Sequence, residues 1–371
     1  MTRILVIDDE VALTEIMSRI LGDAGFKVET ATSGQEGLQK AIRTQPDAVI
    51  LDVMMPDMDG YEVCRRLRHD PRTARASILI TTARGQPVDK TMSLQAGADL
   101  YLAKPVKKDV LISQVRQMLA QKPFGGAPLG RQIAVLHLQK GSGATTLAGN
   151  LASNLSRLPG RLTVIADLDF QAGRVSKYLG IAPGRSWLEA PTLGEDEVIA
   201  HLVHLESGLF VLPAPTLDEV SRPDPQVVGH LLQLLRRWFD FVVVDTPRDM
   251  GKLAVPVMRL SWLILLLLTP DPASLKAARA GLTALYRLGA SSLQIWPVLN
   301  KVGTQPHAFA RQVEKTTGLP VAAMLPWSPQ ECLEAEEKGR PLILDVPDSP
   351  IGKAIQALGQ RVVRASLSTS A

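Results

Sequence analysis

The sequence predicts an α/β protein made of two doubly wound domains, each built on a parallel sheet. The first observation is that short apolar runs alternate with segments of helical spacing along most of the chain. The second is a break at residues 122–131, KPFGGAPLGR, where Pro and Gly occur without periodicity, as in a linker. The third is that the alternation starts again at Ile133. We therefore expect domains at residues 1–121 and 132–371, joined by this linker.

The composition is that of an ordinary globular chain, with 46% hydrophobic residues, 21% charged residues and a net charge of +4. Cys64 and Cys332 are far apart, which argues against a disulfide framework or a zinc site and favours a reducing compartment. The N-terminal segment lacks the long apolar run of a signal peptide. The apolar run at residues 260–268 is too short to span a bilayer and is typical of a buried strand. We expect a cytoplasmic protein, and such mild basicity predicts no specific nucleic acid partner.

The first domain contains five βα units. Its predicted strands are ILVID (4–8), KVETA (27–31), AVILD (48–52), SILIT (77–81) and LYLA (100–103). Apolar residues at helical spacing separate these strands, first over residues 11–24 and last around residues 111–119. Strands that alternate with helices in this way predict a doubly wound parallel sheet.

Acidic, hydroxyl and amine side chains follow the predicted strands of this domain. The residues at the strand ends are Asp8, Asp9, Asp52, Thr82 and Lys104. Because the carboxyl ends of parallel strands meet at one edge of a sheet, we expect these side chains to converge. Three carboxylates repel one another unless a divalent cation binds them, and Mg²⁺ prefers oxygen ligands. An amine and a hydroxyl beside the acids suit an oxygen-rich anion, so the sequence predicts a phosphoryl-transfer site.

The segments ILVIDDE, ILDVMMPDMDGYEV and YLAKP resemble, in order and spacing, the landmarks of a response-regulator receiver domain with its flavodoxin-like fold. The resemblance covers residues 1–120. It implies that a sensor histidine kinase is a partner and that Asp52 accepts its phosphoryl group. It also implies that Mg²⁺ is held by Asp9, Asp52 and the Met54 carbonyl, with help from Asp8.

The same resemblance implies that Thr82 and Lys104 contact the phosphoryl oxygens and that Tyr101 is the aromatic switch residue. The alternative is that the aspartates only cap helices or lie in exposed loops, as any one of them alone would. The match at several strand ends favours the receiver interpretation. Val106 is one departure, because an aromatic residue often follows Lys-Pro in the family. We interpret Gly60 as a turn or cap residue and not as part of the site.

The second domain repeats the α/β pattern over a longer stretch. Its predicted strands are IAVLHL (133–138), LTVIADLD (162–169), LFVLP (209–213), FVVVDTP (241–247), WLILLLLT (262–269) and IWPVLN (295–300). Between the first strand and the following helix lies the segment QKGSGATTLAGNLA, at residues 139–152. A glycine-rich loop in that position is the context of a phosphate-binding loop, or P-loop.

The candidate nucleotide-binding residues of this domain lie on that loop and at later strand ends. They are Gly141, Ser142, Gly143, Ala144, Thr145, Thr146, Asp169, Asp245 and Asn300. The two loop glycines let backbone N–H groups turn toward an anion at a helix N-terminus. The Thr145 hydroxyl is placed to bind Mg²⁺, and Asp245 ends a strand of Walker B form. ATP or ADP with Mg²⁺ is the candidate ligand, and Asn300 is the candidate contact to its base.

The segments QKGSGATTLAGNLA, DLDFQAG, FDFVVVDTP and VLNK resemble the ParA/MinD class of deviant Walker ATPases, over roughly residues 132–362. That class has the loop K-G-G-x-G-K-T-T. Here Gln139 stands where the signature lysine would be and Ala144 where the phosphate lysine would be, while Lys140 comes one residue late. Loss of one such charge commonly costs about 3–4 kcal/mol of transition-state stabilisation. We expect little hydrolysis, with nucleotide bound weakly or not at all; the alternative is a tight turn that binds nothing.

A receiver domain followed by a loop of the form G-x-G-A-T-T resembles the TadZ/CpaE family of pilus-assembly proteins. The resemblance implies a cytoplasmic localisation or assembly factor for a Tad (Flp) type IV-like pilus or secretion machinery. Such a factor is often polar and acts as a homodimer, with the pilus or secretion ATPase as partner. Two alternatives stay open: an active ParA/MinD-like ATPase in partitioning or positioning, and a DNA-binding response regulator.

A segment near the C-terminus, residues 351–364, carries Ile351, Ile355, Leu358 and Val362 on one helical face. Basic residues near the other face permit a surface helix that contacts a membrane peripherally. The alternative, which we favour, is a helix that packs this apolar face on the core.

Overall fold

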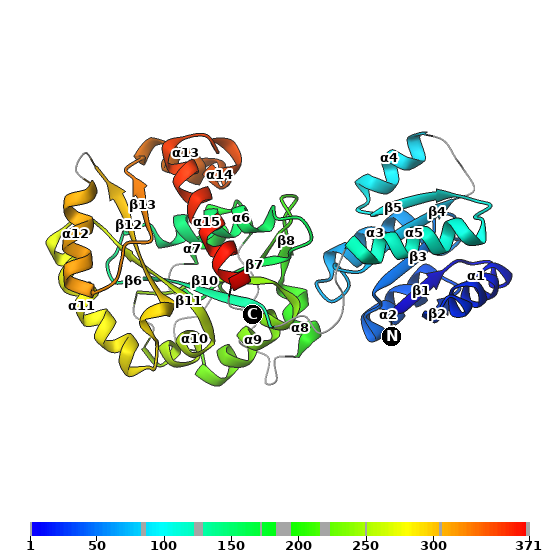
Figure 1. Ribbon diagram of the computed structural model, residues 1–371, viewed down its shortest axis with the longest axis horizontal. Coiled ribbons are helices and arrows are strands. Elements are labelled where there is room, and N and C mark those ends of the chain that lie inside the picture. The colour runs from blue at the N-terminus through cyan, green and yellow to red at the C-terminus, as the bar shows by residue number, and fades with distance from the viewer. Residues whose placement is uncertain are drawn as a thin grey trace. The chain divides into compact units, whose positions relative to one another are not determined.

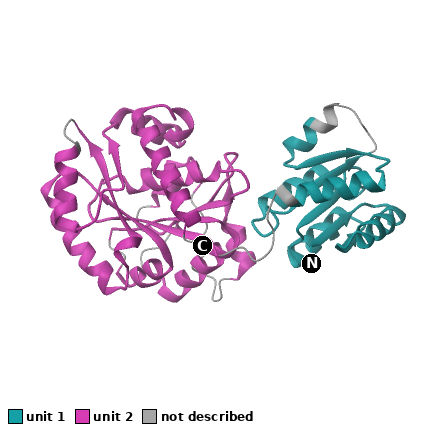
Figure 2. Cartoon of the chain, in the orientation of Figure 1, with its two compact units in different colours: residues 1–128 teal, residues 129–371 magenta. Residues whose placement is uncertain are grey.

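A computed structural model of the chain describes residues 2–82, 87–121, 129–170, 173–182, 194–215, 223–248, 251–303 and 306–368. Contacts divide the chain into two compact units, Met1–Pro128 and Leu129–Ala371 (Figure 2). Each unit is built on its own sheet, of five strands in the first and eight in the second. The predicted fold class is therefore confirmed. Residues 122–128 of the predicted linker lie outside the described residues.

The first unit is a parallel sheet with helices on both faces (Figure 1). Its strands are β1 (Arg3–Ile7), β2 (Lys27–Ala31), β3 (Ala48–Asp52), β4 (Ser77–Thr82) and β5 (Leu100–Ala103), in the order β2-β1-β3-β4-β5. Its helices are α1 (Val11–Asp23), α2 (Gly34–Thr44), α3 (Gly60–His69), α4 (Pro87–Gln95) and α5 (Lys108–Gln121).

Side chains along the central strands of this unit point alternately to the two faces of the sheet and pack into two separate core clusters. Leu5 and Ile7 of β1 belong to a buried cluster that includes residues of α2 and α3. Ile4 and Val6 point to the other face and join a cluster with residues of α1 and α5. Because both faces are covered, the strand is apolar from Ile4 to Ile7, which is why its sequence lacks the polar alternation of a half-exposed strand.

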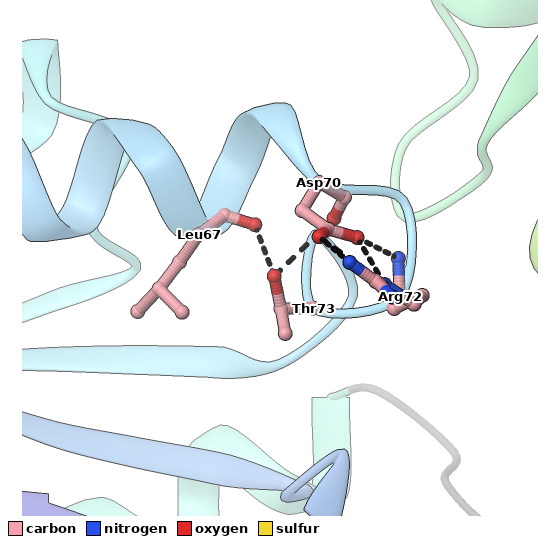
Figure 3. A network of polar contacts seen from close by, with 4 residues as sticks. All are labelled: Leu67, Asp70, Arg72 and Thr73. Atoms are coloured by element: carbon pink, nitrogen blue, oxygen red, sulfur yellow. Dashed lines mark hydrogen bonds and ion pairs between the residues drawn. The ribbon is translucent and has the colours of Figure 1, made fainter. Parts of the chain in front are cut away.

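A polar network ends α3 and leads the chain into β4, at the edge of the sheet where the strands begin (Figure 3). Asp70 accepts hydrogen bonds from the Arg72 backbone at 2.9 Å and from its guanidinium at 2.7 Å. The Thr73 hydroxyl donates to the Leu67 carbonyl at 2.8 Å, near the end of the helix. This buried turn positions the start of β4, and the length of the strand then sets the position of its carboxyl end.

The second unit has a larger sheet and more helices (Figure 1). Its strands are β6 (Arg131–His137), β7 (Thr163–Asp167), β8 (Val203–His204), β9 (Leu209–Leu212), β10 (Phe241–Asp245), β11 (Ser261–Leu268), β12 (Ile295–Val302) and β13 (Ala323–Pro326). Its α-helices are α6 (Ala144–Ser156), α7 (Arg174–Tyr178), α8 (Glu195–His201), α9 (Pro225–Trp238), α10 (Ala254–Leu260), α11 (Pro272–Arg287), α12 (Pro306–Thr317), α13 (Pro329–Lys338), α14 (Leu342–Asp345) and α15 (Pro350–Ser368). Two short 3₁₀ helices are η1 (Gly251–Leu253) and η2 (Ser292–Gln294).

The strand order of this sheet is β13-β12-β11-β6-β10-β7-β9-β8. Neighbouring strands are parallel except at one edge, where β8 pairs antiparallel with β9. The prediction of a parallel sheet did not include this edge strand. Residues 205–208 are too few for a crossover, so the chain can only turn back beside itself.

The C-terminal helix α15, red in Figure 1, packs on α6 and β13. Its residues Ile351, Ile355, Leu358 and Val362 are buried in a core cluster of the second unit. The core-packing interpretation of this segment is therefore confirmed, and these four residues form no exposed apolar face. No helix in the described part of the chain combines the length and the hydropathy that crossing a membrane requires.

Candidate functional site

The receiver pocket lies at the carboxyl edge of the first sheet. Asp8 and Asp9 follow β1, Asp52 ends β3, Thr82 ends β4 and Lys104 follows β5. Parallel pairing of these strands brings the residues to one edge, as the sequence predicted. Asp8, Asp52 and Thr82 are buried, with 2%, 4% and 1% exposure, while Asp9 is open to water.

One amine bridges two carboxylates in this pocket. Lys104 Nζ lies 2.7 Å from Asp8 Oδ2 and 2.7 Å from Asp52 Oδ1. The backbone N–H of Met54 donates to the other Asp52 oxygen at 2.9 Å. Lys104 is itself anchored, because its backbone N–H donates to the Thr82 carbonyl at 2.8 Å. Asp52 is therefore held in place through both of its oxygens.

The charges of the pocket do not cancel. Burial acts to lower the pKa of Lys104, but its hydrogen bonds with Asp52 and Asp8 outweigh burial, so this pKa is raised. The pKa of Asp52 is also raised, because burial and the neighbouring Asp8 charge act against Lys104. A single cation cannot neutralise two buried carboxylates. The pocket favours a second cation.

The donor set fits Mg²⁺. Carboxylate oxygens of Asp8, Asp9 and Asp52 lie within 4.8 Å of one another. Mg²⁺ binds one or two carboxylates together with several waters, and exposed Asp9 leaves room for them. These three residues would hold the ion. The role of the Met54 carbonyl as a further ligand stays a prediction.

Gly60 lies against the strand end that carries Asp52. This residue begins α3, after Asp59 caps the helix by accepting a hydrogen bond from Tyr61 N at 3.0 Å. A Cβ atom on Gly60 would clash with the carbonyl oxygen of Asp52. The glycine therefore lets α3 start directly against the strand end that carries the phosphoacceptor candidate. An Asp-Gly pair shortly after the strand was the available signal.

Tyr101 lies on β5, half-buried, and packs against the core cluster shared by α2 and α3. Thr82 is paired in register with Ala103, directly before Lys104. The predicted switch residues thus occupy adjacent strands beside the pocket. Their roles in phosphoryl binding and signalling stay predictions.

The P-loop of the second unit joins β6 to α6. Gly141 and Gly143 have φ values of 74° and 91°, a left-handed conformation that glycine adopts without strain. Gly143 precedes the first residue of the helix, and a Cβ atom on it would clash with the Asn300 amide nitrogen. The loop therefore keeps the tight backbone path that points helix N–H groups toward an anion.

Two buried carboxylates lie beneath this loop. Thr145 Oγ1 donates a 2.7 Å hydrogen bond to Asp245 Oδ2, which joins two predicted site residues. Asp245 pairs in register with Asp167 of β7. Burial and the Asp167 charge raise the pKa of Asp245 well above its usual value. Burial likewise raises the pKa of Asp167 to about 7, although the N–H groups of Val175 and Asp169 donate to it.

Asp167 was not among the predicted site residues, whereas Asp169 was. Asp169 is half-buried, and its N–H donates to Asp167. The signal that could have found Asp167 is its place at the end of an apolar strand, level with Asp245. Whether Asp169 contacts a nucleotide stays a prediction.

Asn300 braces the P-loop. Its amide nitrogen donates to the Ser142 carbonyl at 2.7 Å, and its amide oxygen accepts from the Lys301 N–H at 2.9 Å. Both ends of the amide are therefore used inside the protein. Its predicted contact with a nucleotide base stays a prediction, and these bonds would have to change for it.

The two positions without lysine have local partners of their own. Gln139 Oε1 lies 3.0 Å from Thr269 Oγ1, and its amide nitrogen lies 3.4 Å from Asp271 Oδ1. Ala144 is buried in the core cluster that contains α15. The Gln139 side chain, at the signature position, therefore contacts residues of its own unit. The Ala144 side chain, at the phosphate position, packs into the core.

Residues 4–116 match the family model of the response regulator receiver domain. The DNA-binding dual master transcriptional regulator RpaA of Synechocystis is 44% identical over 119 residues, which cover 32% of this chain and 49% of RpaA. The chain spans about half the length of the curated relatives it matches. The first unit is therefore a receiver domain of the response-regulator class.

The second unit resembles solved structures of the MinD and ParA proteins. A ParA family ATPase from Chlorobium tepidum has a TM-score of 0.58 at 20% identity, covering 62% of this chain and 98% of the ATPase. MinD from Pyrococcus horikoshii, solved with Mg-ADP, has a TM-score of 0.56 at 22% identity, covering 64% and 98%. The chain therefore joins a receiver domain to a domain with the MinD/ParA fold.

Proposed function

We propose that this chain is a phosphorylation-responsive localisation or assembly factor for a Tad (Flp) type IV-like pilus or secretion machinery. The observation that carries the proposal is the contrast between its two sites. Lys104 lies 2.7 Å from both Asp8 and Asp52, whereas Gln139 and Ala144 replace both P-loop lysines. TadZ/CpaE-type proteins, which the sequence resembles, share the order of the two domains and the alanine in the P-loop.

In the proposed reaction, an Asp52 carboxylate oxygen attacks the phosphorus of a phosphohistidine on a sensor kinase. The bond from phosphorus to the histidine nitrogen breaks, and its electron pair stays on the nitrogen. The Lys104 amine is within reach of the transferred group because it already contacts Asp52. Mg²⁺ bound by the three aspartates would neutralise negative charge on the phosphoryl oxygens. Thr82 would donate a hydrogen bond to one of them.

The MinD/ParA-like unit would carry the response to the machinery. Phosphorylation would bias Thr82 and Tyr101 and alter a homodimer surface. We propose that this unit binds nucleotide weakly or not at all and hydrolyses little, because each missing lysine removes about 3–4 kcal/mol of transition-state stabilisation. Its partner would be the pilus or secretion ATPase or other polar machinery, in the cytoplasm.

The test is the mass of the full chain by size exclusion with light scattering, with Mg²⁺ present, before and after adding beryllium fluoride. This anion mimics a phosphoryl group on aspartate. We expect the oligomeric state to change in the parent and in Asp23→Asn, which alters an exposed aspartate of α1. The Asp52→Asn variant should show no change. Identical masses with and without the mimic in the parent would count heavily against the proposal.

Two further measurements separate the alternative functions. Mg²⁺-dependent ATP turnover that Asp245→Ala abolishes would favour an active ParA/MinD-like ATPase. Steeply salt-dependent binding to duplex DNA would favour a DNA-binding regulator. For the machinery itself, the Asp52→Asn variant should change the number or position of pili in cells that carry the gene, as counted by electron microscopy.

A further inference from the structure

A cavity of about 460 Å³ lies beside the P-loop of the second unit. The P-loop, Arg248 in the loop after β10, and the ends of β11 and β12 contribute to its walls. This volume is within the range of small-ligand sites, and the walls are rich in polar side chains. The cavity is therefore large enough for more than a single water or ion.

Three cationic side chains from separate segments converge on this cavity. They are Lys140 of the P-loop, Arg248 after β10 and Lys301 of β12. Within the described part of the chain, none of the three forms an ion pair with a carboxylate. Like charges repel when they gather in one recess, so the arrangement favours an anion there.

Among the described residues that line the cavity, Asp271 is the one carboxylate, and it is already hydrogen-bonded. Asp271 accepts hydrogen bonds from Thr269 Oγ1 at 2.6 Å and from the Ser274 N–H at 2.8 Å, where it caps α11. Burial acts to raise the pKa of Asp271, but these hydrogen bonds outweigh it, and the pKa is lowered. Asp271 is thus ionised, but it is outnumbered by the cations around it.

Lys301 reaches the cavity because β12 is irregular at its end. Adjacent side chains of a regular strand point to opposite faces. Here the register with β13 shifts between Leu299 and Val302, and Lys301 has a φ of 58°, in the left-handed region. Asn300 can therefore contact the P-loop while Lys301 lines the cavity, with its amine 4.9 Å from the centre of the Trp327 ring. Bulges of this kind are frequent beside functional sites.

Ser142 gives an independent observation. This P-loop residue lines the cavity and is 3% exposed, and its hydroxyl has no hydrogen-bond partner among the residues that the structure describes. A buried hydroxyl without a partner costs free energy, so native proteins seldom keep one without a reason. A ligand oxygen at the cavity wall would satisfy it.

We propose that this cavity binds the phosphate groups of a pyrophosphate-containing anion, with Lys140, Arg248 and Lys301 supplying the positive charge that positions 139 and 144 no longer supply. The inference rests on the proposed function and deepens it, because it names side chains that would hold the phosphates of a weakly bound nucleotide. Free pyrophosphate and the terminal phosphates of a nucleotide offer the same chemistry, so the experiment includes both.

The test is calorimetry on the full chain at low salt with Mg²⁺, using pyrophosphate, ATP and AMP as separate probes. We expect the parent to bind pyrophosphate and ATP more tightly than AMP, which lacks linked phosphates. The double variant Arg248→Gln/Lys301→Gln should weaken both by about tenfold, since each lost contact is a charge-assisted one near the surface. Lys353→Gln removes an exposed cation of α15 outside the cavity and should change affinity by less than about twofold.

Two single variants guard against a general loss of structure. Lys140→Gln changes an exposed side chain and should weaken binding about threefold to fivefold without affecting the circular dichroism spectrum. Ser142→Ala should leave the melting temperature of the free protein unchanged or higher, because it removes an unpartnered hydroxyl, and should still weaken pyrophosphate binding. If Ser142 had only a structural role, its substitution would not weaken pyrophosphate binding while leaving the melting temperature unchanged or higher.

The outcomes distinguish this inference from the proposed function. Equal ATP affinity in the parent and the double variant would overturn the cavity proposal while leaving nucleotide binding in place. ATP binding without pyrophosphate binding would overturn it too, because nucleoside contacts would then carry the affinity. If the parent binds neither at millimolar concentration, the cavity proposal fails, whereas the receiver's response to beryllium fluoride still decides the proposed function.

Discussion

In both sheets of this chain, acidic residues lie at the carboxyl ends of the strands. The side-chain donors that contact these acids differ between the two sheets. In the receiver unit, Lys104 contacts Asp8 and Asp52 directly, at 2.7 Å. In the second unit, Asp167 and Asp245 are more deeply buried, and the side-chain donor that meets Asp245 is the neutral Thr145 hydroxyl. Topology places the acids in both cases, since strand ends of a parallel sheet share an edge.

This difference indicates that a lysine next to the acids determines which chemistry the carboxyl edge of the sheet can support. With Lys104 at 2.7 Å from two of them, the receiver acids can bind a metal ion together with a phosphoryl group. Without a lysine at residue 144, the second edge has a shaped loop and two carboxyls with raised pKa values. We therefore expect covalent phosphoryl chemistry at the first edge and ligand binding at the second.

The largest effect should come from removing the acceptor of the first edge. Asp52→Asn keeps the shape of the side chain but removes the nucleophilic carboxylate, so phosphoryl uptake should fall to background. The measurement is intact-mass spectrometry after incubation with acetyl phosphate and Mg²⁺. The control Asp23→Asn should be labelled like the parent. Equal labelling of Asp52→Asn would place the acceptor elsewhere and break the comparison.

The next effect should come from restoring a cation to the second edge. Ala144→Lys should raise the affinity for Mg-ATP by about tenfold to a hundredfold, the range of a charge-assisted hydrogen bond to phosphate. Calorimetry measures it, after circular dichroism has shown that the buried site accepts the longer side chain. Ala144→Met adds similar length without charge and should bring no gain. A gain in both variants would mean that packing, and not charge, limits binding.

A smaller effect tests the backbone beneath the receiver pocket. Gly60→Ala should lower the free energy of unfolding of the first unit by about 1–3 kcal/mol, because the new methyl group would overlap the Asp52 carbonyl. Gly22→Ala in α1 meets open space and should raise it by about 0.5–1 kcal/mol. Urea denaturation of both variants gives the comparison. Equal stabilities would show that α3 can move away from β3 freely.

The smallest effect concerns metal binding and pH. The pKa of Asp52 is raised, chiefly by burial, so the carboxyl keeps its proton above its ordinary titration range. Mg²⁺ must displace that proton, and its stabilising effect should therefore grow as pH rises through this pKa. With a dissociation constant near 1 mM, 10 mM Mg²⁺ would stabilise the receiver by about 1.4 kcal/mol at neutral pH.

Thermal unfolding at pH 5 and pH 7.5, with and without Mg²⁺, measures this dependence. The Asp52→Asn variant should lose most of it, since Asn has no proton to release and no charge to offer the ion. A larger Mg²⁺ effect at pH 5 than at pH 7.5 would contradict the assignment of Asp52 as a ligand.

The receiver pocket was predictable because it depends on strand ends. Asp8, Asp52 and Lys104 each follow an apolar run, and any parallel sheet that contains these runs brings the three together. The P-loop path was predictable for a similar reason, since Gly141 and Gly143 permit the left-handed turns that the structure shows. Local sequence and general topology were sufficient for both.

Other features depend on contacts that no local pattern encodes. The bond from Asn300 to the Ser142 carbonyl joins residues that lie 158 positions apart. The tie from Gln139 to Thr269 depends on where β11 ends relative to β6. Lys301 lines the cavity because β12 is irregular at its end, and the sequence of this strand does not predict the irregularity. Charge at a site can therefore come from residues outside the motif that identifies the site.

The packing of α15 on α6 has a consequence for how the chain is made. The core cluster that holds Ala144 and Leu147 at the start of α6 is completed by Ile351, Ile355 and Leu358 of α15. During translation, the P-loop helix therefore cannot be fully buried until α15 has left the ribosome. The receiver unit has core clusters of its own and can fold much earlier, as domains commonly do during synthesis. The part of the chain that would receive the signal is thus ready before the part that would respond to it.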